Sequence, residues 1–407
     1  MKTVLMLSTY PFKQPRHGGQ VRTAAIAKAY TDDGYAVSSI SVFETESYGP
    51  DAYDRSDVEF PPSSPYRRFR GRNVPLVTDL LTGHYATAED GGLSLIMGRL
   101  PKQIDVIHVE QPWLWPLARK IKAIKPYSHA CLVYGSQNIE APLKKEILDS
   151  YGIKDADDVI EEINLLERSA AAEADIAVAV TKADFDVLST WGCKSLVLAA
   201  NGISPWHAST EKLDYWSARL PQAPWILYVA SAHPPNFQGF NESLGGSLAC
   251  IPPDSRLVVA GSVGEHLARV LSNTRWGSLN CSRLELLYIL PDEDLSAVKT
   301  LAHAFLLPIP HGGGSNIKTA EAIYSGKYVI GSDPAFRGFE RYAEEEGITV
   351  ARTPNEFHQA IRHVLTQPEL PRLSAVSADH RESVTWQKTL SIIPQSVNQV
   401  ISVGAGV

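Results

Sequence analysis

Short hydrophobic runs alternate along the chain with longer segments in which hydrophobic residues recur at helical spacing. The longer segments include Val21–Asp32, Leu114–Ile124 and Asp157–Glu173. Strands that alternate with helices are typical of parallel sheets covered by helices on both faces. The strands predicted from the short runs are Val4–Ser8, Val37–Phe43, Val106–Val109, Cys131–Tyr134, Ile176–Val180, Leu196–Ala200, Ile226–Ala230, Leu257–Ala260, Leu286–Leu290, Phe305–Ile309, Tyr328–Ile330 and Ile348–Val350.

The alternation is interrupted from Ile203 to Pro224, a stretch with three prolines, two tryptophans and no clean period. We therefore predict an α/β protein with two Rossmann-like, doubly wound parallel-sheet domains that face a central cleft. The predicted division is an N-terminal domain over 1–203, a linker over 204–224 and a C-terminal domain over 225–385. A tail over 386–407 could return to the N-terminal domain. Ligands of such sheets bind at the carboxyl ends of the strands, so we expect the functional residues in the loops there.

Composition narrows the class of protein. The 407 residues suit two or three domains, and 44% hydrophobic residues are enough for sizeable cores. The net charge of −7 disfavours nucleic acid as a partner. No uncharged run approaches the roughly 20 residues of a membrane span, and the four cysteines form no CxxC pair. We expect a cytoplasmic protein with free thiols and no metal site.

The loop after the first strand carries Gly18 and Gly19 directly before a helix. Paired glycines let a ligand approach the backbone closely, and a helix N-terminus offers free N–H groups to an anion. The loop is not GxGxxG, and Glu44 after the second strand is only a weak match to a ribose-binding acid. Nicotinamide-cofactor binding is therefore disfavoured.

Polar residues also follow two central strands. Alternation along the third predicted strand puts Val106, His108 and Glu110 on one side, and Asn138 lies in a polar cluster after the next strand. At a strand exit, His108 and Glu110 are candidates for a catalytic cleft. A core histidine with a capping carboxylate is the structural alternative.

The strongest local signal follows the strand that ends at Ile309. Three glycines precede Ser315 and Asn316 at a predicted helix start, and Lys318 and Glu321 lie one turn apart. Amide donors, the helix dipole and a lysine suit a diphosphate, and Glu321 could accept from sugar hydroxyls. A structural glycine turn with a surface Lys–Glu pair remains the alternative. An esterase is disfavoured because no G-x-S-x-G occurs. The glycines are Gly312, Gly313 and Gly314.

An arginine-rich segment stands out in this acidic protein. Arg67, Arg68, Arg70 and Arg72 lie within seven residues, interleaved with aromatic residues. Such a segment could meet an anionic lipid surface or a phosphorylated acceptor, whereas a solvated loop is the structural alternative.

Taken together, these loops resemble the glycosyltransferases of the GT-B fold, specifically the retaining family 4 group, from Thr3 to about Leu365. The Pro15–Arg22 loop, the Asp105–Pro112 strand exit and Gly312–Glu321 are each similar to a motif of that group. Further similar segments are Leu166–Arg168, Ala174–Ile176, Thr181–Asp184, Ala200–Ile203, Ala322 and Gly326–Ile330.

Three positions depart from the family's pattern. Gly313 stands where a first glutamate is common, Gln238 where a lysine is common, and Glu110 where a cleft histidine is common, with His108 two residues earlier. These changes leave phosphate neutralisation to Lys318, to backbone amides and to His233, and they keep an inactive protein as an alternative.

The resemblance implies transfer of a sugar from a nucleotide-sugar donor to a hydroxyl of a glycan, lipid-linked or small-molecule acceptor, with retention and without metal or cofactor. It makes the N-terminal domain the acceptor side and the C-terminal domain the donor side. Donor diphosphate would meet Gly18, Gly19, Gly312–Asn316 and Lys318, and donor ribose Glu321. The donor-side loop would supply Ser231, His233 and Asn236, while His108, Glu110 and Asn138 would orient the reactants. Arg67, Arg68, Arg70 and Arg72 would dock an acceptor or the inner face of a membrane.

Two other functions stay open. A non-catalytic GT-B protein that binds a glycan or a partner is suggested by Gly313 and Gln238. A sugar-nucleotide epimerase is the other, because one epimerase type shares the fold.

Overall fold

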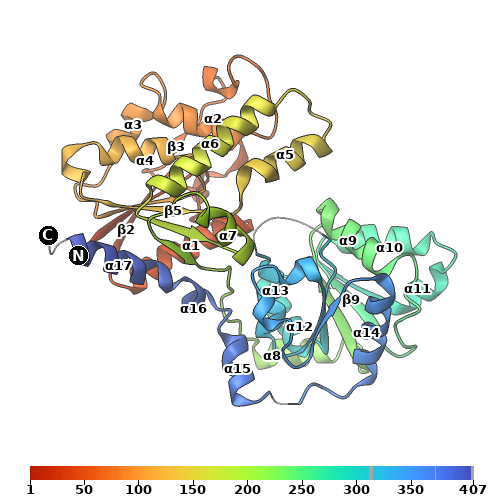
Figure 1. The fold of residues 1–407 in the computed structure, drawn as a ribbon. Coiled ribbons are helices and arrows are strands. Elements are labelled where there is room, and N and C mark those ends of the chain that lie inside the picture. Colours follow the sequence, from red (N-terminus) through yellow and green to blue (C-terminus); the bar gives the residue numbers. More distant parts are fainter. Residues whose placement is uncertain (311–314, 372, 405–407) are drawn as a thin grey trace. The chain divides into compact units, whose positions relative to one another are not determined.

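The protein is described by a computed structural model that covers residues 1–310, 315–371 and 373–404. The chain forms two compact units. Unit 1 consists of Met1–Ala200 with Thr389–Val407, and unit 2 of Asn201–Lys388. Figure 1 shows that each unit is a sheet with helices on both faces.

Unit 1 is built on a seven-stranded sheet of order β3-β2-β1-β4-β5-β6-β7, and every pairing within it is parallel. Helices α2, α4 and α6 cover one face and α1 and α17 the other (Figure 1). The strands are β1 (Thr3–Ser8), β2 (Ala36–Phe43), β3 (Val58–Glu59), β4 (Val106–Glu110), β5 (Cys131–Gly135), β6 (Ile176–Ala179) and β7 (Leu196–Leu198). The helices are α1 (Gly18–Asp32), α2 (Thr78–Thr87), α3 (Leu93–Met97), α4 (Trp115–Lys122), α5 (Glu140–Ser150), α6 (Asp157–Glu173), α7 (Lys182–Ser189) and α17 (Ile392–Gly404), with 3₁₀ turns at Thr45–Ser47, Pro50–Ala52, Pro65–Arg67 and Lys125–Tyr127.

Unit 2 is built on a six-stranded parallel sheet of order β10-β9-β8-β11-β12-β13. Its strands are β8 (Trp225–Val229), β9 (Arg256–Ala260), β10 (Leu284–Tyr288), β11 (Ala304–Leu307), β12 (Tyr328–Ser332) and β13 (Ile348–Ala351). Its helices are α8 (Thr210–Ser217), α9 (Pro234–Leu244), α10 (Val263–Ser272), α11 (Gly277–Arg283), α12 (Asp292–Leu301), α13 (Ile317–Tyr324), α14 (Pro354–Thr366) and α15 (Ala375–Glu382), with 3₁₀ turns at Asp333–Phe336 and Glu340–Tyr342; α16 (Trp386–Leu390) spans the boundary of the two units.

The predicted fold class is confirmed, and each predicted strand is present with ends shifted by a few residues at most. The structure has one further strand that was not predicted, β3, whose two residues are too few to produce a hydrophobic pattern. The segment 204–224 contains α8, which packs against α12 inside unit 2.

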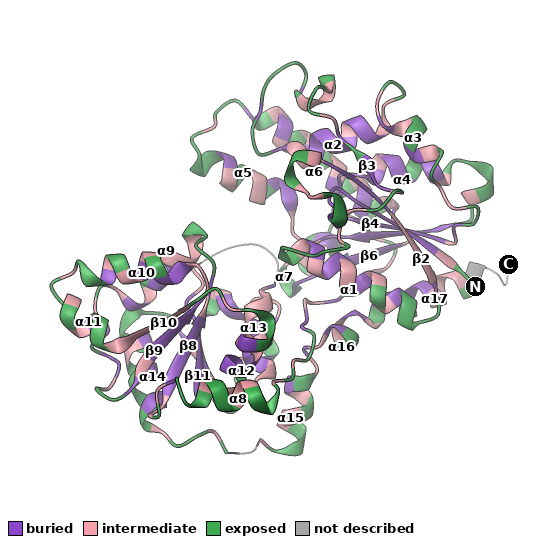
Figure 2. Ribbon diagram, turned by 180° about the vertical axis from the view of Figure 1, so that it is seen from behind, coloured by how far each residue is buried: buried purple, intermediate pink, exposed green. Residues whose placement is uncertain are grey.

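Both faces of the central strands are buried, as Figure 2 shows by their purple colour. Along β8, Ile226 and Tyr228 pack in one hydrophobic cluster, whereas Trp225 and Leu227 pack in another on the opposite face. Continuous hydrophobic runs such as this one are what a parallel strand buried on both sides requires.

The C-terminal helix α17 completes unit 1. It packs against α1, β5 and β6. Asn398 fixes it there, because its side-chain oxygen accepts from the Tyr35 hydroxyl at 2.6 Å and its amide donates to Asp33 at 2.7 Å. Ile393 is fully buried, whereas its neighbour Ile392 is 37% exposed.

We expect Ile393→Ala to lower the free energy of unfolding by about 2–4 kcal/mol, because it leaves a cavity under α17. Urea unfolding followed by tryptophan fluorescence measures the loss. Ile392→Ala is the matched control and should cost less than about 1 kcal/mol. Equal losses in the two variants would contradict this packing.

Candidate active site

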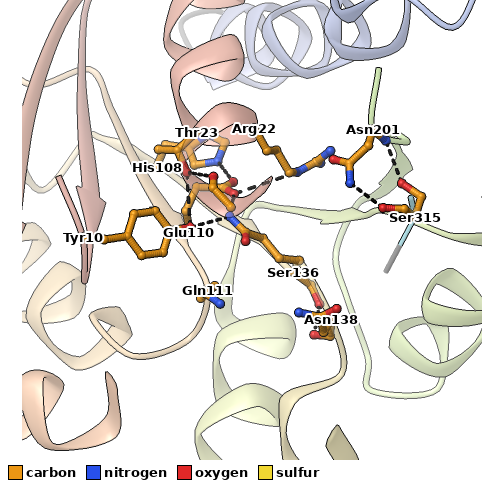
Figure 3. Close-up of polar contacts among 12 residues, drawn as sticks. Tyr10, Arg22, Thr23, His108, Glu110, Gln111, Ser136, Asn138, Asn201 and Ser315 are labelled. Carbon is orange, nitrogen blue, oxygen red and sulfur yellow. Dashed lines mark hydrogen bonds and ion pairs between the residues drawn. The ribbon is translucent and has the colours of Figure 1, made fainter. Parts of the chain in front are cut away.

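His108 and Glu110 form a buried pair at the carboxyl end of β4 (Figure 3). The Nε2 atom of His108 donates to Glu110 Oε1 at 2.8 Å. The other ring nitrogen, Nδ1, is hydrogen-bonded to the Tyr30 hydroxyl at 2.9 Å. Both side chains are shielded from solvent. His108 and Glu110 therefore lie on the same side of β4, as predicted. His108 is buried, as the alternative of a core histidine requires.

Glu110 is held in its charged form by its partners. Burial by itself raises the pKa of Glu110, but the hydrogen bond from His108, the charges of His108 and Arg22, and the hydrogen bond from Gln137 outweigh burial, so the net pKa lies below the usual value. The Arg22 guanidinium lies 3.9 Å from Glu110 Oε2, and Gln137 donates to the same oxygen at 2.7 Å. Since neither His108 nor Glu110 reaches the surface, any orienting role they have is indirect.

Two glycines make room for this cluster. A Cβ on Gly135 of β5 would lie 1.9 Å from Glu110 Oε1, so only glycine fits beside that carboxylate. A Cβ on Gly19 would lie 2.9 Å from both Gln137 Oε1 and the Tyr10 hydroxyl oxygen. Gly18, the other glycine of the predicted phosphate loop, is the first residue of α1. The packing of the chain's own side chains therefore explains Gly19 without a ligand.

Asn138 lies two residues before α5 and is half-buried beside two buried carboxylates, Glu140 and Glu167. Its amide donates to Glu140 Oε1 at 3.3 Å. Glu167, from α6, accepts from the backbone N–H groups of Glu140 and Ala141 and so satisfies the N-terminus of α5. Burial raises the pKa of Glu140 to about 7 and that of Glu167 to about 8. The resemblance included Glu167 without a role, and the structure gives it a capping role.

A cavity of about 370 Å³ lies in unit 1 where three parallel strands end. Thr9 and Tyr10 follow β1, Glu44 follows β2 and Gln111 follows β4, and all four line it. We call this cavity the Asp79 pocket. Its other lining residues are His17, Ser47, Tyr48, Leu76, Thr78, Asp79 and Thr82.

Most of these lining residues were missed by the sequence analysis. Thr78, Asp79 and Thr82 are on α2, far along the chain from the strand ends, and no motif marks them. Leu76 and Gln111 both adopt the left-handed conformation, with φ of 65° and 63°. Non-glycine residues held in that region store strain and concentrate at functional sites.

In unit 2, residues of the predicted donor-side loop meet Lys318. The Lys318 ammonium donates to Asn236 Oδ1 at 2.9 Å, although 82 positions separate the two residues. Asn236 in turn donates to the Ser231 carbonyl at 3.0 Å. His233 occupies the position before the first turn of α9 and is exposed. The structure thus brings Lys318, Asn236 and Ser231 together at the carboxyl end of β8.

Lys318 is a partly buried cation with a neutral partner. Burial lowers its pKa, and the charge of Glu321 offsets this only in part. Among the described residues Lys318 forms no ion pair with a carboxylate. The Glu321 carboxylate is instead bonded to Lys299 of α12, at 2.6 Å. An anion that binds beside Lys318 would supply the missing negative charge.

The residues before Lys318 have structural contacts. Asn316 is the N-cap of α13, as expected, and its Oδ1 accepts from the Lys318 N–H at 2.9 Å. Ser315 accepts from the backbone and the side-chain amide of Asn201, at 3.0 and 2.9 Å. Gly312, Gly313 and Gly314 lie outside the described residues.

The arginine cluster is paired with carboxylates. Arg67 contacts Glu44 and Glu46, while Arg70 and Arg72 both contact Asp158. Arg68 is exposed. Three of the four arginines are thus paired with acidic residues distant in sequence, and the docking role expected of the cluster stays a prediction.

Within the described part of the chain, no helix is long and apolar enough to cross a membrane. The same residues contain no group of three or more His, Cys, Asp and Glu side chains that could hold a metal ion.

The sequence matches no protein-family model and no curated protein. Its structure, however, matches solved structures over its whole length. These matches show that the chain has the GT-B fold of glycosyltransferases, as the resemblance implied. Sucrose-phosphate synthase from Thermosynechococcus elongatus matches with a TM-score of 0.72 at 15% identity, over 99% of this chain and 100% of that one. HepE from Anabaena in complex with UDP matches with a TM-score of 0.57 at 14% identity, over 100% of both chains. WaaG, a glycosyltransferase involved in lipopolysaccharide biosynthesis, matches with a TM-score of 0.61 at 14% identity, over 98% of this chain and 99% of that one.

We expect Gly135→Ala to destabilise unit 1 by about 3 kcal/mol or more, because the new methyl group must displace Glu110 from its buried partners. Urea unfolding measures the change. Gly49→Ala is the control, since nothing lies within 4 Å of a Cβ there and its φ is −75°. That variant should stay within about 0.5 kcal/mol of the parent. A stable Gly135→Ala protein would show that Glu110 can move without cost.

Proposed function

We propose that this protein transfers a glycosyl group from a nucleotide-sugar donor to a hydroxyl acceptor. The observation that carries the proposal is the partly buried Lys318, whose described hydrogen-bond partner is the neutral Asn236, in a chain with the GT-B fold. Lys318 lies in the first turn of α13, where the positive end of the helix dipole also favours an anion. The matched HepE structure holds UDP, which supports a nucleoside diphosphate as this anion.

The donor site is assigned to unit 2. Lys318, Ser315 and Asn316, together with Gly312–Gly314, would bind the diphosphate, and Glu321 would accept from the ribose hydroxyls. Lys299 holds one oxygen of Glu321, so the carboxylate is oriented before the ligand arrives. The ribose role therefore depends on the lone pairs that Lys299 leaves available.

In the proposed reaction, the bond between the anomeric carbon and the diphosphate oxygen breaks, and the acceptor oxygen bonds to that carbon. The acceptor proton passes to the departing phosphate oxygen. Negative charge grows on the diphosphate as it leaves, and the Lys318 ammonium and the positive end of the α13 dipole stabilise that charge. Retention of configuration and independence from metal belong to the proposal, since the resemblance implies both and an ammonium group supplies positive charge beside the diphosphate.

Lys318→Ala should weaken binding of both UDP and inorganic pyrophosphate by about ten- to a hundredfold, the value of one lost charge-assisted hydrogen bond. Glu321→Gln should weaken the binding of UDP but not that of pyrophosphate, because pyrophosphate has no ribose. Titration calorimetry measures both ligands, with ADP, GDP and CDP added to identify the base. Lys327→Ala, just beyond α13, is the control for Lys318 and Glu242→Gln, on α9, the control for Glu321. Unchanged affinities in both site variants would refute the donor site.

Nucleotide affinity should also fall with rising pH earlier than an ordinary lysine allows. Only the protonated ammonium pairs with the diphosphate, and burial lowers the pKa of Lys318. Affinity is therefore complete below that lowered pKa and is lost as the pH rises through it. Lys318→Arg should remove the fall up to the usual lysine pKa of about 10.4, because arginine stays protonated. Calorimetry across this range gives the profile, and identical profiles for the two proteins would exclude Lys318 as the titrating group.

Product analysis with a bound nucleotide sugar separates the remaining functions. Transfer or slow hydrolysis of the donor supports a glycosyltransferase. Conversion of the sugar without an acceptor would instead identify an epimerase, and no reaction with any donor would identify a binding protein.

A further inference from the structure

The Asp79 pocket is lined by groups suited to a hydroxyl-rich ligand. Four hydroxyl side chains, two carboxylates and one amide face a cavity of about 370 Å³, a volume within the range of small-molecule sites. Aromatic rings and Leu76, which is 42% exposed, add apolar surface. Carboxylates only accept hydrogen bonds, whereas hydroxyls both donate and accept, so this lining can pair with many sugar hydroxyls. The hydroxyl residues are Thr9, Ser47, Thr78 and Thr82.

Asp79 is held in place with room for a ligand. Its Oδ1 accepts from the Thr9 hydroxyl at 3.1 Å, and its Oδ2 accepts from the Lys144 ammonium at 3.3 Å. Each carboxylate oxygen has a second acceptor position. The side chain is 37% exposed, so those positions are accessible. A fixed carboxylate of this kind loses little entropy when it binds.

The positive charges around the pocket are already engaged or lie outside its lining. Lys144 contacts Asp79, and Arg67 contacts Glu44. Arg16 acts on Tyr48 through its charge but is exposed and does not line the cavity. None of the described lining residues is Lys or Arg, and partial desolvation lowers the pKa of His17, which favours its neutral form.

We propose that the Asp79 pocket binds the acceptor and that this acceptor presents an uncharged, hydroxyl-rich sugar to it. A phosphate or carboxylate group on the ligand would lie beside Glu44 and Asp79, whose contacting cations, Arg67 and Lys144, are already paired with them. Such like-charge contacts select against a charged ligand. This inference rests on the proposed transferase function and specifies its acceptor class. Among the acceptors implied by the resemblance, it favours a neutral glycan or small sugar over a phosphorylated one.

The pocket is coupled to the buried cluster of unit 1. Tyr10, which lines it, accepts from Gln137, and Gln137 also donates to Glu110. Gln111 lines the pocket and follows Glu110 directly in a strained conformation. The buried pair of His108 and Glu110 thereby positions two lining residues, which gives both a role that requires no contact with the ligand.

The test is direct binding of sugars without nucleotide, measured by saturation-transfer NMR. The probes are neutral methyl glycosides and disaccharides, each compared with its 6-phosphate and its uronic acid. We expect the neutral sugars to bind at least about tenfold tighter than their charged counterparts. Asp79→Asn should weaken the binding of neutral sugars by about tenfold, the value of one lost charge-assisted hydrogen bond. It should also reduce the ratio of the affinities for neutral and charged sugars.

A gain-of-binding variant keeps the test independent of folding. Ser47→Lys places an ammonium at the lining and should raise affinity for the 6-phosphates by about tenfold or more, whereas Ser94→Lys on α3, exposed and outside the pocket, should not. UDP binding should be unchanged in every variant. Phosphorylated sugars that bind the parent as well as neutral ones would overturn the proposal. So would a parent that binds UDP but no neutral sugar of the panel. Sugar binding without any nucleotide binding would overturn the transferase function and leave this pocket assignment intact.

Discussion

The parallel pairing of every strand is the constraint on which the rest of the structure depends. Parallel neighbours need a crossover between them, so each strand of a sheet begins at one edge and ends at the other. All the strand-end loops of a unit therefore gather at one edge. In unit 1 this edge carries the Asp79 pocket and the exit of β4. In unit 2 it carries Ser231 after β8, which the Lys318–Asn236 contact joins to α13. The polar groups that define both sites are neighbours because of this pairing.

Within that framework, close approach decides which side chains can be used. Gly135 on β5 leaves the space that Glu110 on β4 occupies, and the two residues are partners in the same ladder. A buried carboxylate is stable there because His108, Gln137 and Arg22 surround it. The unit thus places a charge at its centre at the cost of one side chain on the next strand. In unit 2 the arrangement is the reverse, since the ammonium of Lys318 is hydrogen-bonded to a neutral partner, Asn236.

The distribution of charge also differs from what composition suggests. Arg67, Arg70 and Arg72 form a basic segment in the sequence, yet each is paired with a carboxylate in the structure. The pairs join residues up to 92 positions apart. The guanidinium groups of Arg67 and Arg70 also lie over the rings of Phe60 and Phe69.

The sequence by itself determined the fold class, every strand except the two-residue β3, and the local chemistry of the loops. Continuous hydrophobic runs such as β8 are typical of central parallel strands, and Asn316 before α13 is an N-cap in sequence and in structure alike. Alternation along β4 likewise placed His108 and Glu110 on one side. These features depend on neighbours within a few residues, which is why a pattern reveals them.

Only the tertiary structure decided which distant groups meet. It pairs Lys318 with Asn236, gives Glu321 to Lys299, buries His108 and brings Asp79 of α2 to the ends of three strands. The spacing of residues along the chain does not predict these contacts, because each contact joins elements whose order in the sheet is set by the crossovers. Burial follows the same rule, since whether a polar side chain reaches a ligand or another side chain depends on what packs over it.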